Sequence, residues 1–442
     1  MFPYYFGLAL RSLAHKLVLT VLMIAAIGVG IGASMTTLTI FRAMSGDPIP
    51  NKSGQLFVPQ IDNWGLTANR KSGLLSADQL PDQLSYTDAM ALMQTHAAKR
   101  QAAMYVTRLA VTPSNPQLRP FQVDARATYE DFFAMFEVPF IYGGPWSKTD
   151  DESHAAVLVI TRELNDRLFK GANSVGKTID LDNENYRIVG VLSDWRPVPR
   201  FYDLNNGKQY GKTEQVFLPF TRAIDQHKGT QGNNNCKLDD VGVGWDGHLR
   251  SSCVWIQYWA ELPTPADANG YRAFLNNYAA EQYRTGRFHW PPNTQLSGLR
   301  KWLDDHHVVS DEVRILVAVS FSFLFVCLLN AMSLMLAKII GRASDVGVRR
   351  ALGANRRAIF AQYLVEACVI GVAGGLLGLL LTAVGLMGVR SLVSKQILPV
   401  THLDLADIRI ALLLAILATV TAALYPTWRA IKVQPAQQLK VQ

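Results

Sequence analysis

The segment whose residue types come closest to a known chemistry is Gly171 to Thr178, which reads GANSVGKT. It has the form G-x-x-x-x-G-K-[ST], in which backbone N–H groups and a lysine hold the phosphates of a nucleotide. That chemistry needs a strand before the loop and a helix after it, so that the helix N-terminus faces the phosphates. Here a helical pattern over 161–169 comes first, and the alternating stretch 178–192, with a polar turn at 182–185, follows. The order predicts a loop that enters a β-hairpin and carries no nucleotide.

A second group of potential ligands is the run Asp304, Asp305, His306 and His307. Four adjacent residues on a helix point in different directions, so they cannot converge on one metal ion without partners from elsewhere. We interpret the run as a solvated helix. The spacing of the remaining Ser, His, Asp and Cys residues assembles no catalytic arrangement. We therefore expect a non-enzymatic chain with no cofactor, no metal site and no catalytic residues.

The elements that carry these residues are organised around four long apolar runs, each of a length that can cross a bilayer. The first follows Lys16 and is too long for a cleaved signal sequence, so it predicts a retained anchor with the N-terminus inside. Four spans then place both chain ends inside. Five arginines between the second and third runs agree with this, because arginine clusters beside spans are usually cytoplasmic. They are Arg342, Arg349, Arg350, Arg356 and Arg357.

The predicted order of units follows directly. It comprises a cytoplasmic N-terminus (1–16), a first transmembrane helix (17–41), an extracytoplasmic domain (42–312), a second helix (315–340), a cytoplasmic helix (341–358), a third helix (360–386), a short external loop (388–407), a fourth helix (408–425) and a cytoplasmic tail (426–442).

The extracytoplasmic stretch mixes strand and helix patterns. Runs of β-branched and aromatic residues at 157–160, 186–192 and 253–262 predict strands. The spacing of apolar residues over 265–283, after Thr264, predicts a helix. The stretch 193–252 reads as long and irregular. The fold class is therefore a membrane protein with four transmembrane helices and a large α+β domain inserted between the first two.

Two cysteines of this domain, Cys236 and Cys253, bracket a glycine-rich loop. An oxidising compartment favours a disulfide between them, which would stabilise an otherwise loose segment. Two unpaired thiols, or a metal-binding pair, are the alternatives.

Small residues inside the spans predict close helix packing. Gly28 and Gly32 form a G-x-x-x-G pair in the first span, and Gly374 and Gly375 lie in the third.

Charged residues are rare in the spans. Lys338, Glu366 and Arg409 are near span ends, where we expect them to reach the membrane interface. No row of polar residues lines an ion or proton path, which argues against a self-sufficient transporter or channel. The net charge of +8 comes largely from residues that flank the spans, and no basic run with interleaved aromatics indicates nucleic-acid binding.

A family resemblance rests on four segments. Residues 345–354, DVGVRRALGA, are similar to the E-I-G-x-R-R-A-L-G-A cytoplasmic helix of MacB/FtsX-type permeases of ABC systems, the mechanotransmission class, with Asp345 where glutamate is usual. Residues 362–367, 425–440 and the hairpin 175–192 resemble the same family. The hairpin match gives a second reason to reject a nucleotide site.

The resemblance implies a coupling helix that docks on a cytoplasmic ABC ATPase dimer. The residues carried over are Asp345, Gly347, Arg349, Arg350, Ala351, Leu352, Gly353 and Arg356. Because only about 16 residues precede the first span, we expect the ATPase on a separate chain. The resemblance also implies the bacterial inner membrane with its lipid, a second permease subunit in a homo- or heterodimer, and a MacB-like periplasmic core. A pump would add a periplasmic adaptor and an outer-membrane duct.

The expected function is to transmit ATP-driven motion across the membrane to the periplasmic domain for export of peptides, antibiotics, siderophores or similar molecules. Two alternatives stay open. One is an FtsX-like regulator of cell-wall hydrolases that transports nothing, and the other is Lol-type lipoprotein release.

Overall fold

The computed structural model describes residues 16–64, 80–207, 209–236, 242–341, 348, 355–392 and 405–432. The chain divides into two compact units. The helical unit is formed by the two ends of the chain, 1–45 and 309–442. The inserted unit is formed by the residues between them, 46–308.

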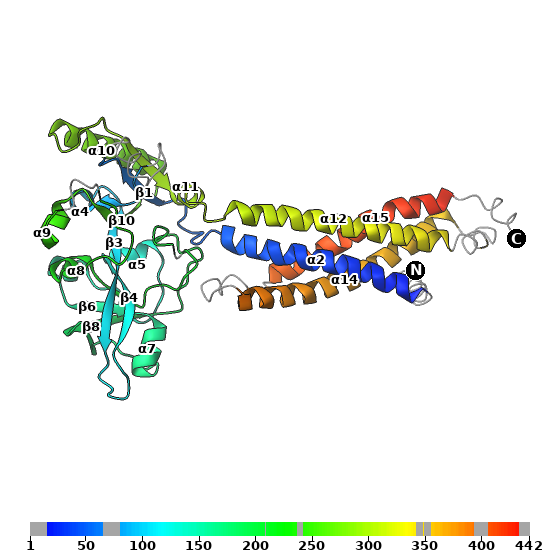
Figure 1. The fold of residues 1–442 in the computed structure, drawn as a ribbon, viewed down its shortest axis with the longest axis horizontal. Helices are drawn as coiled ribbons and strands as arrows, with labels where there is room; N and C mark the ends of the chain where they lie inside the picture. Colours follow the sequence, from blue (N-terminus) through cyan, green and yellow to red (C-terminus); the bar gives the residue numbers. More distant parts are fainter. Residues whose placement is uncertain are drawn as a thin grey trace. The chain divides into compact units, whose positions relative to one another are not determined.

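The helical unit contains four long helices that run alongside one another (Figure 1). They are α2 (Leu17–Ser45), α12 (Asp311–Ile340), α14 (Arg356–Leu392) and α15 (Leu405–Lys432). Among the described residues, these four are long and apolar enough to cross a bilayer. The predicted fold class, with four spans and a large domain between the first two, is confirmed.

The centre of the helical unit is apolar and combines small with branched side chains. Met23, Ile27 and Ile31 of α2 are buried there with Ala415 of α15 and Leu324 of α12. Other large apolar side chains of the same helices point outward, including Leu316, Phe325, Leu376 and Leu413. A helix that is apolar all round is typical of a membrane span, since lipid covers the outward face.

The inserted unit is built on a mixed sheet. Within its described residues, the sheet has eleven strands, with a main order of β11-β1-β10-β3-β4-β9-β6-β8-β5. The strands are β1 (Leu56–Ile61), β2 (Leu84–Ser85), β3 (Arg100–Thr112), β4 (Phe121–Thr128), β5 (Phe140–Gly143), β6 (Val157–Ile160), β7 (Thr178–Leu181), β8 (Glu184–Leu192), β9 (Val216–Pro219), β10 (Val254–Glu261) and β11 (Thr294–Gly298).

Helices lie against this sheet in the inserted unit. They are α4 (Tyr86–Thr95), α5 (Asp131–Met135), α6 (Lys148–Glu152), α7 (Arg162–Phe169), α8 (Phe220–Asp225), α9 (Gly244–Arg250), α10 (Pro265–Arg284) and α11 (Leu299–Asp305). The longest, α10, begins with a capping box in which Thr264 accepts from the Asp267 N–H and Asp267 accepts from the Thr264 N–H. Pro265 occupies its first turn, where a missing N–H does no harm.

Both faces of the sheet are covered. Leu158 and Ile160 of β6 belong to one buried cluster, while the alternate residues Val157 and Val159 belong to the other. Successive residues of a strand point to opposite faces, so this division shows that β6 is buried on both sides. Strand β10 is likewise buried at every position.

The strands predicted at 157–160, 186–192 and 253–262 and the helix over 265–283 are confirmed as β6, β8, β10 and α10. The interpretation of 193–252 as irregular is wrong in part. It contains β9, which pairs in parallel with β4 and antiparallel with β6 near the middle of the sheet. The strand is only four residues long and ends in a proline. A run this short gives no periodicity signal.

Candidate functional site

The predicted coupling residues Asp345, Gly347, Arg349, Arg350, Ala351, Leu352 and Gly353 lie outside the described residues. Their described flanks are the end of α12 at Ile340 and the start of α14. Arg356, the last of the predicted set, is the first residue of α14.

Helix α14 begins at an N-terminal cap formed by Asn355. The Asn355 Oδ1 accepts a hydrogen bond from the Arg357 backbone N–H at 3.2 Å. The Asn355 carbonyl accepts from the N–H groups of Ala358 and Ile359. Asparagine is among the best N-cap residues, so the sequence itself sets where the chain enters the third span.

An ion pair joins α12 and α14 next to this segment. The Lys338 Nζ donates to the Glu366 carboxylate, and the two side chains are only 3% and 2% exposed. Lys338 is in the last turn of α12, where the helix dipole favours a positive charge. The sequence predicted these charges near the membrane interface, and it did not predict that Lys338 and Glu366 are buried against each other. Each has the other as its partner, so neither needs to leave the bundle.

Helix α2 approaches α14 at two of the predicted packing glycines. A Cβ placed on Gly28 would lie 2.7 Å from the Leu377 Cδ2, and one on Gly32 would lie 2.7 Å from the Leu381 Cβ. Both distances are too short for real atoms, so only glycine permits this separation of the two helices.

The glycines of α14 make equally close contacts with two different helices. A Cβ on Gly374 would lie 2.7 Å from the Ile27 Cγ2 of α2. A Cβ on Gly375 would lie 2.9 Å from the Ala415 Cβ of α15. Helix α14 therefore packs tightly on both neighbours.

Hydroxyl groups connect α2 with α12. The Ser34 Oγ donates to the Ser320 carbonyl at 2.9 Å, and the Thr37 and Ser320 hydroxyls are 2.7 Å apart. Such contacts between helices stabilise a membrane bundle by up to about 1–2 kcal/mol each.

A buried charged network lies in the inserted unit around Arg126, which is completely buried. Its guanidinium donates to Asp203 at 2.6 Å, to Glu214 at 2.5 Å and to the Gln257 side chain at 2.6 Å. Arg200 donates to Asp203 as well. Burial alone would raise the pKa of Glu214, but Arg126 and Arg200 outweigh it and lower that pKa to about 2.

A cavity of about 310 Å³ borders this network. Its lining includes Arg108 and Arg200 as well as Asp124, Asp203 and Glu214. Because these charges are mixed and pair with one another, the cavity favours no ion of either sign. The network acts as a structural link between β4, β10 and the 200–214 segment.

The nucleotide-like segment forms the predicted hairpin entry, which is confirmed by the pairing of β7 with β8. The Gly176 N–H donates to the Ile188 carbonyl at 2.8 Å, and the Lys177 N–H donates to the Ser174 carbonyl at 3.0 Å. The Lys177 Nζ lies 5.1 Å from the centre of the Phe169 ring. These backbone groups bond within the fold and leave no cradle for phosphates.

The run Asp304 to His307 does not form a metal site in the described structure. The His306 Nε2 lies 3.0 Å from the Asp82 Oδ2, so this ring is held by a residue outside the run. Burial would lower the pKa of His306, but the hydrogen bond and charge of Asp82 outweigh it and raise that pKa. The interpretation as a solvated helix does not extend to His306, whose side chain is mostly buried and packs on Trp302.

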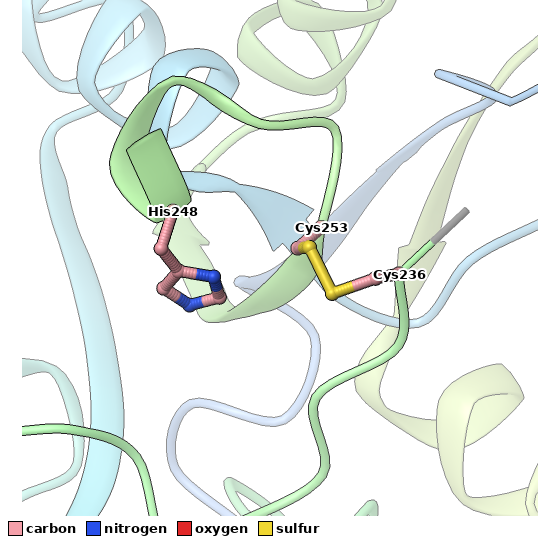
Figure 2. Close-up of side chains that lie close together, drawn as sticks. All are labelled: Cys236, His248 and Cys253. Atoms are coloured by element: carbon pink, nitrogen blue, oxygen red, sulfur yellow. A yellow bond between two sulfur atoms is a disulfide. The ribbon is translucent and has the colours of Figure 1, made fainter. Parts of the chain in front are cut away.

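Cys236 and Cys253 are joined by a disulfide. Figure 2 shows the imidazole of His248, from α9, beside them. The ligand atoms of the three residues all lie within 4.8 Å of one another. Among the described residues, Cys236, His248 and Cys253 are the group whose ligand atoms lie close enough together to bind one metal ion.

Two protein families match separate stretches of this sequence. Residues 20–269 match the MacB-like periplasmic core domain, and residues 317–435 match the FtsX-like permease C-terminal family. The first match covers more than half of the chain. The chain belongs to the MacB/FtsX-type family of ABC transporter permeases. It is therefore a multi-pass inner-membrane protein with a large periplasmic domain.

Known relatives are distant. The pyoverdine export ATP-binding/permease protein PvdT of Pseudomonas syringae pv. syringae (strain B728a) is 24% identical over 311 residues, which are 70% of this chain and 41% of PvdT. The chain thus spans less than half the length of that relative. The uncharacterized ABC transporter permease YvrN of Bacillus subtilis (strain 168) is 22% identical over 327 residues, which are 70% of this chain and 68% of YvrN. The periplasmic region of MacB from Actinobacillus actinomycetemcomitans aligns at 13% identity and a TM-score of 0.35, covering 57% of this chain and 91% of that region.

Sequence reasoning missed two pairings of this permease. Lys338 and Glu366 are 28 residues apart, and no local pattern connects them. Arg126 gave no local signal of burial, because Asp124 and Arg126 alternate with apolar residues along β4. Such alternation is typical of a strand with one exposed polar face.

Proposed function

We propose that this chain is the non-catalytic permease subunit of an ABC system, and that it transmits the motion of a separate ATPase dimer to its periplasmic unit. Two copies of the chain, or this chain and a related permease, work with two ATPase subunits. The segment 341–358 is the docking element, through Asp345, Arg349, Arg350 and their neighbours.

The observation that carries the proposal is the continuity of α12. Only Val309 and Ser310 separate it from the inserted unit, and it ends at Ile340, beside the proposed docking element. A helix of this length spans about 45 Å, well beyond the roughly 30 Å of a bilayer core. A rigid rod with one end beside the ATPase and the other beside the periplasmic unit can carry a displacement across the membrane without a substrate channel.

The contacts of α12 support the same role. The Lys338–Glu366 pair attaches its cytoplasmic half to α14, and the hydroxyls of Ser34, Thr37 and Ser320 attach it to α2. Movement of the segment between α12 and α14 would therefore move both helices and, through the glycine contacts, α2. Packed helices transmit such shifts because their interfaces are not continuously deformable.

The substrate class is proposed as molecules taken from the periplasm, such as peptides, antibiotics or siderophores. The relative PvdT is a pyoverdine export ATP-binding/permease protein, which favours export over regulation of wall hydrolases. In such a pump, an adaptor and an outer-membrane duct complete the path.

The docking proposal is tested by purifying the full-length chain from native membranes after cross-linking and identifying its partners by mass spectrometry. We expect an ABC ATPase in stoichiometric amount. The double variant Arg349→Glu/Arg350→Glu should reduce its recovery by at least about tenfold, since two reversed charges at one contact each cost on the order of 1 kcal/mol or more. Equal recovery would refute the docking assignment.

A matched control reverses two arginines on the periplasmic side. Arg284 and Arg314 are both exposed, so Arg284→Glu/Arg314→Glu changes the net charge equally and should leave ATPase recovery unchanged.

Lys177→Ala should leave ATP hydrolysis by the purified complex intact. Loss of ATP hydrolysis in the Lys177→Ala complex would indicate that residues 171–178 bind a nucleotide.

Export is tested separately by comparing the compounds in the medium and periplasm of cells with and without the chain. The proposal expects at least one compound that accumulates in the periplasm without it, together with an adaptor among the cross-linked partners. Recovery of a wall hydrolase, with no exported compound, would contradict the pump.

A further inference from the structure

The Cys236–Cys253 region belongs to the inserted unit and contributes no residue to the proposed docking element. We propose that it is a redox-gated zinc site. The disulfide is its closed form, and reduction opens a site in which Cys236, His248 and Cys253 bind one Zn²⁺.

The backbone holds the two cysteines together independently of the disulfide. Asn235 and Val254, their immediate neighbours, form an antiparallel bridge with N–H···O=C hydrogen bonds of 3.1 and 2.8 Å. Cys236 follows one partner of the bridge, and Cys253 precedes the other. Breaking the S–S bond therefore leaves both sulfur atoms at the same place in the fold.

The third ligand, on helix α9, is held against strand β10. The His248 ring stacks on Trp255 of β10, with ring centres 5.3 Å apart. Trp255 is 1% exposed, so it is a fixed support. Within the described part of the chain, neither ring nitrogen of His248 forms a hydrogen bond. The imidazole is thus positioned beside the sulfur atoms and available as a ligand (Figure 2).

The ligand set determines the metal class. Two thiolates and one imidazole suit a borderline-soft ion such as Zn²⁺, and three protein ligands leave the fourth tetrahedral position for water. Ca²⁺ and Mg²⁺ require oxygen ligands, which this group lacks.

The redox step is a two-electron thiol–disulfide exchange with a dithiol reductant. A thiolate of the reductant attacks the Cys236 sulfur, which is the more accessible of the two because Cys253 is fully buried. The S–S bond breaks and the Cys253 thiolate leaves. The second thiol of the reductant then resolves the mixed disulfide, giving two cysteine thiols and the oxidised reductant. Binding of Zn²⁺ displaces the two thiol protons.

The test is a zinc titration of the purified full-length protein, in competition with a chromophoric chelator, before and after reduction with dithiothreitol and its removal under nitrogen. We expect one Zn²⁺ per chain in the reduced protein only. Co²⁺ should give the same stoichiometry, with the thiolate charge-transfer and intense visible bands of a tetrahedral site.

Variants distinguish this site from other thiols, because Cys327 and Cys368 are present in all of them. His248→Ala keeps both cysteines and the disulfide, so it should fold, and it should weaken Zn²⁺ binding by at least about 10–100-fold. The matched control is His227→Ala, which removes a neighbouring ring that contacts Trp245 and leaves the three ligands intact. It should bind Zn²⁺ as the wild type does. Reduced protein that takes up no zinc, or His248→Ala binding as tightly as the wild type, would overturn the proposal.

Discussion

The buried pair of Lys338 and Glu366 gives the sharpest test of how α12 is attached to the bundle. Replacing Glu366 with leucine leaves the Lys338 ammonium buried without its partner, and replacing Lys338 removes the ammonium group that the Glu366 carboxylate binds. Removing one member of a buried pair destabilises a protein by about 3–5 kcal/mol. Replacing both by leucine removes both desolvation penalties and should be close to neutral.

Thermal unfolding of the protein in detergent measures this cycle. One kcal/mol corresponds to roughly 2–4 °C for a unit of this size, so each single variant should lower the Tm by about 6–20 °C. The double variant should recover most of that loss, which gives a coupling free energy of several kcal/mol. Ser322→Ala is the control, because Ser322 is exposed on the same helix and its hydroxyl bonds only to the Ala318 carbonyl one turn before it.

Two results would refute the reasoning. If each single variant is as stable as the wild type, the two charges reach water or lipid headgroups and the pair contributes nothing. If the double variant is as unstable as the singles, the stabilisation comes from packing of the two side chains and not from their charges.

Three further outcomes are expected. Gly28→Val places side-chain atoms against Leu377 and should destabilise the helical unit by about 1–3 kcal/mol, as measured by thermal unfolding. Gly388→Ala is the control and should leave the stability unchanged, because no atom lies within 4 Å of a Cβ added there. Because the pKa of Glu214 is lowered to about 2 from an ordinary value of 4.5, its contribution, on the order of 3 kcal/mol, is present above about pH 4.5 and lost as the pH falls toward 2. Glu214→Gln should therefore flatten the loss of stability between pH 5 and 3, and an unchanged acid profile would exclude this carboxylate as the cause. Because the pKa of His306 is raised, its pair with Asp82 stabilises the fold below about pH 6.5 and less as the pH rises through the raised value. The Tm difference between wild type and Asp82→Asn should shrink from pH 6 to pH 8.5.

The parts of the fold that could be predicted from sequence depend on local patterns. The four spans follow from the length of their apolar runs, and the start of α10 follows from the cap at Thr264 and the proline after it. The hairpin over β7 and β8 follows from alternation and a polar turn. In each case the determining residues are neighbours in the chain.

The remaining parts depend on contacts between distant residues. Strand β9 is recognisable only because β4 and β6 lie on either side of it. The partners of Arg126 come from the 200–214 segment and from β10, and they are 77 to 131 residues away in the chain. The proposed docking residues stay a prediction, because they rest on resemblance. The proximity of His248 to the two cysteines depends on how α9 folds back onto β10, which no spacing rule indicates.

The pairing of β1 with β11 has a mechanical consequence. These strands are the first and last of the inserted unit, and they are antiparallel, with Phe57 opposite Gly298. The chain therefore enters and leaves the unit at the same end of one strand pair. A force that separated the two ends would break the hydrogen bonds between β1 and β11 one after another, starting at Phe57. A force that moved both ends together would load none of them. Separation of the two ends would therefore break this strand pair, whereas a joint displacement of both ends would leave its hydrogen bonds intact.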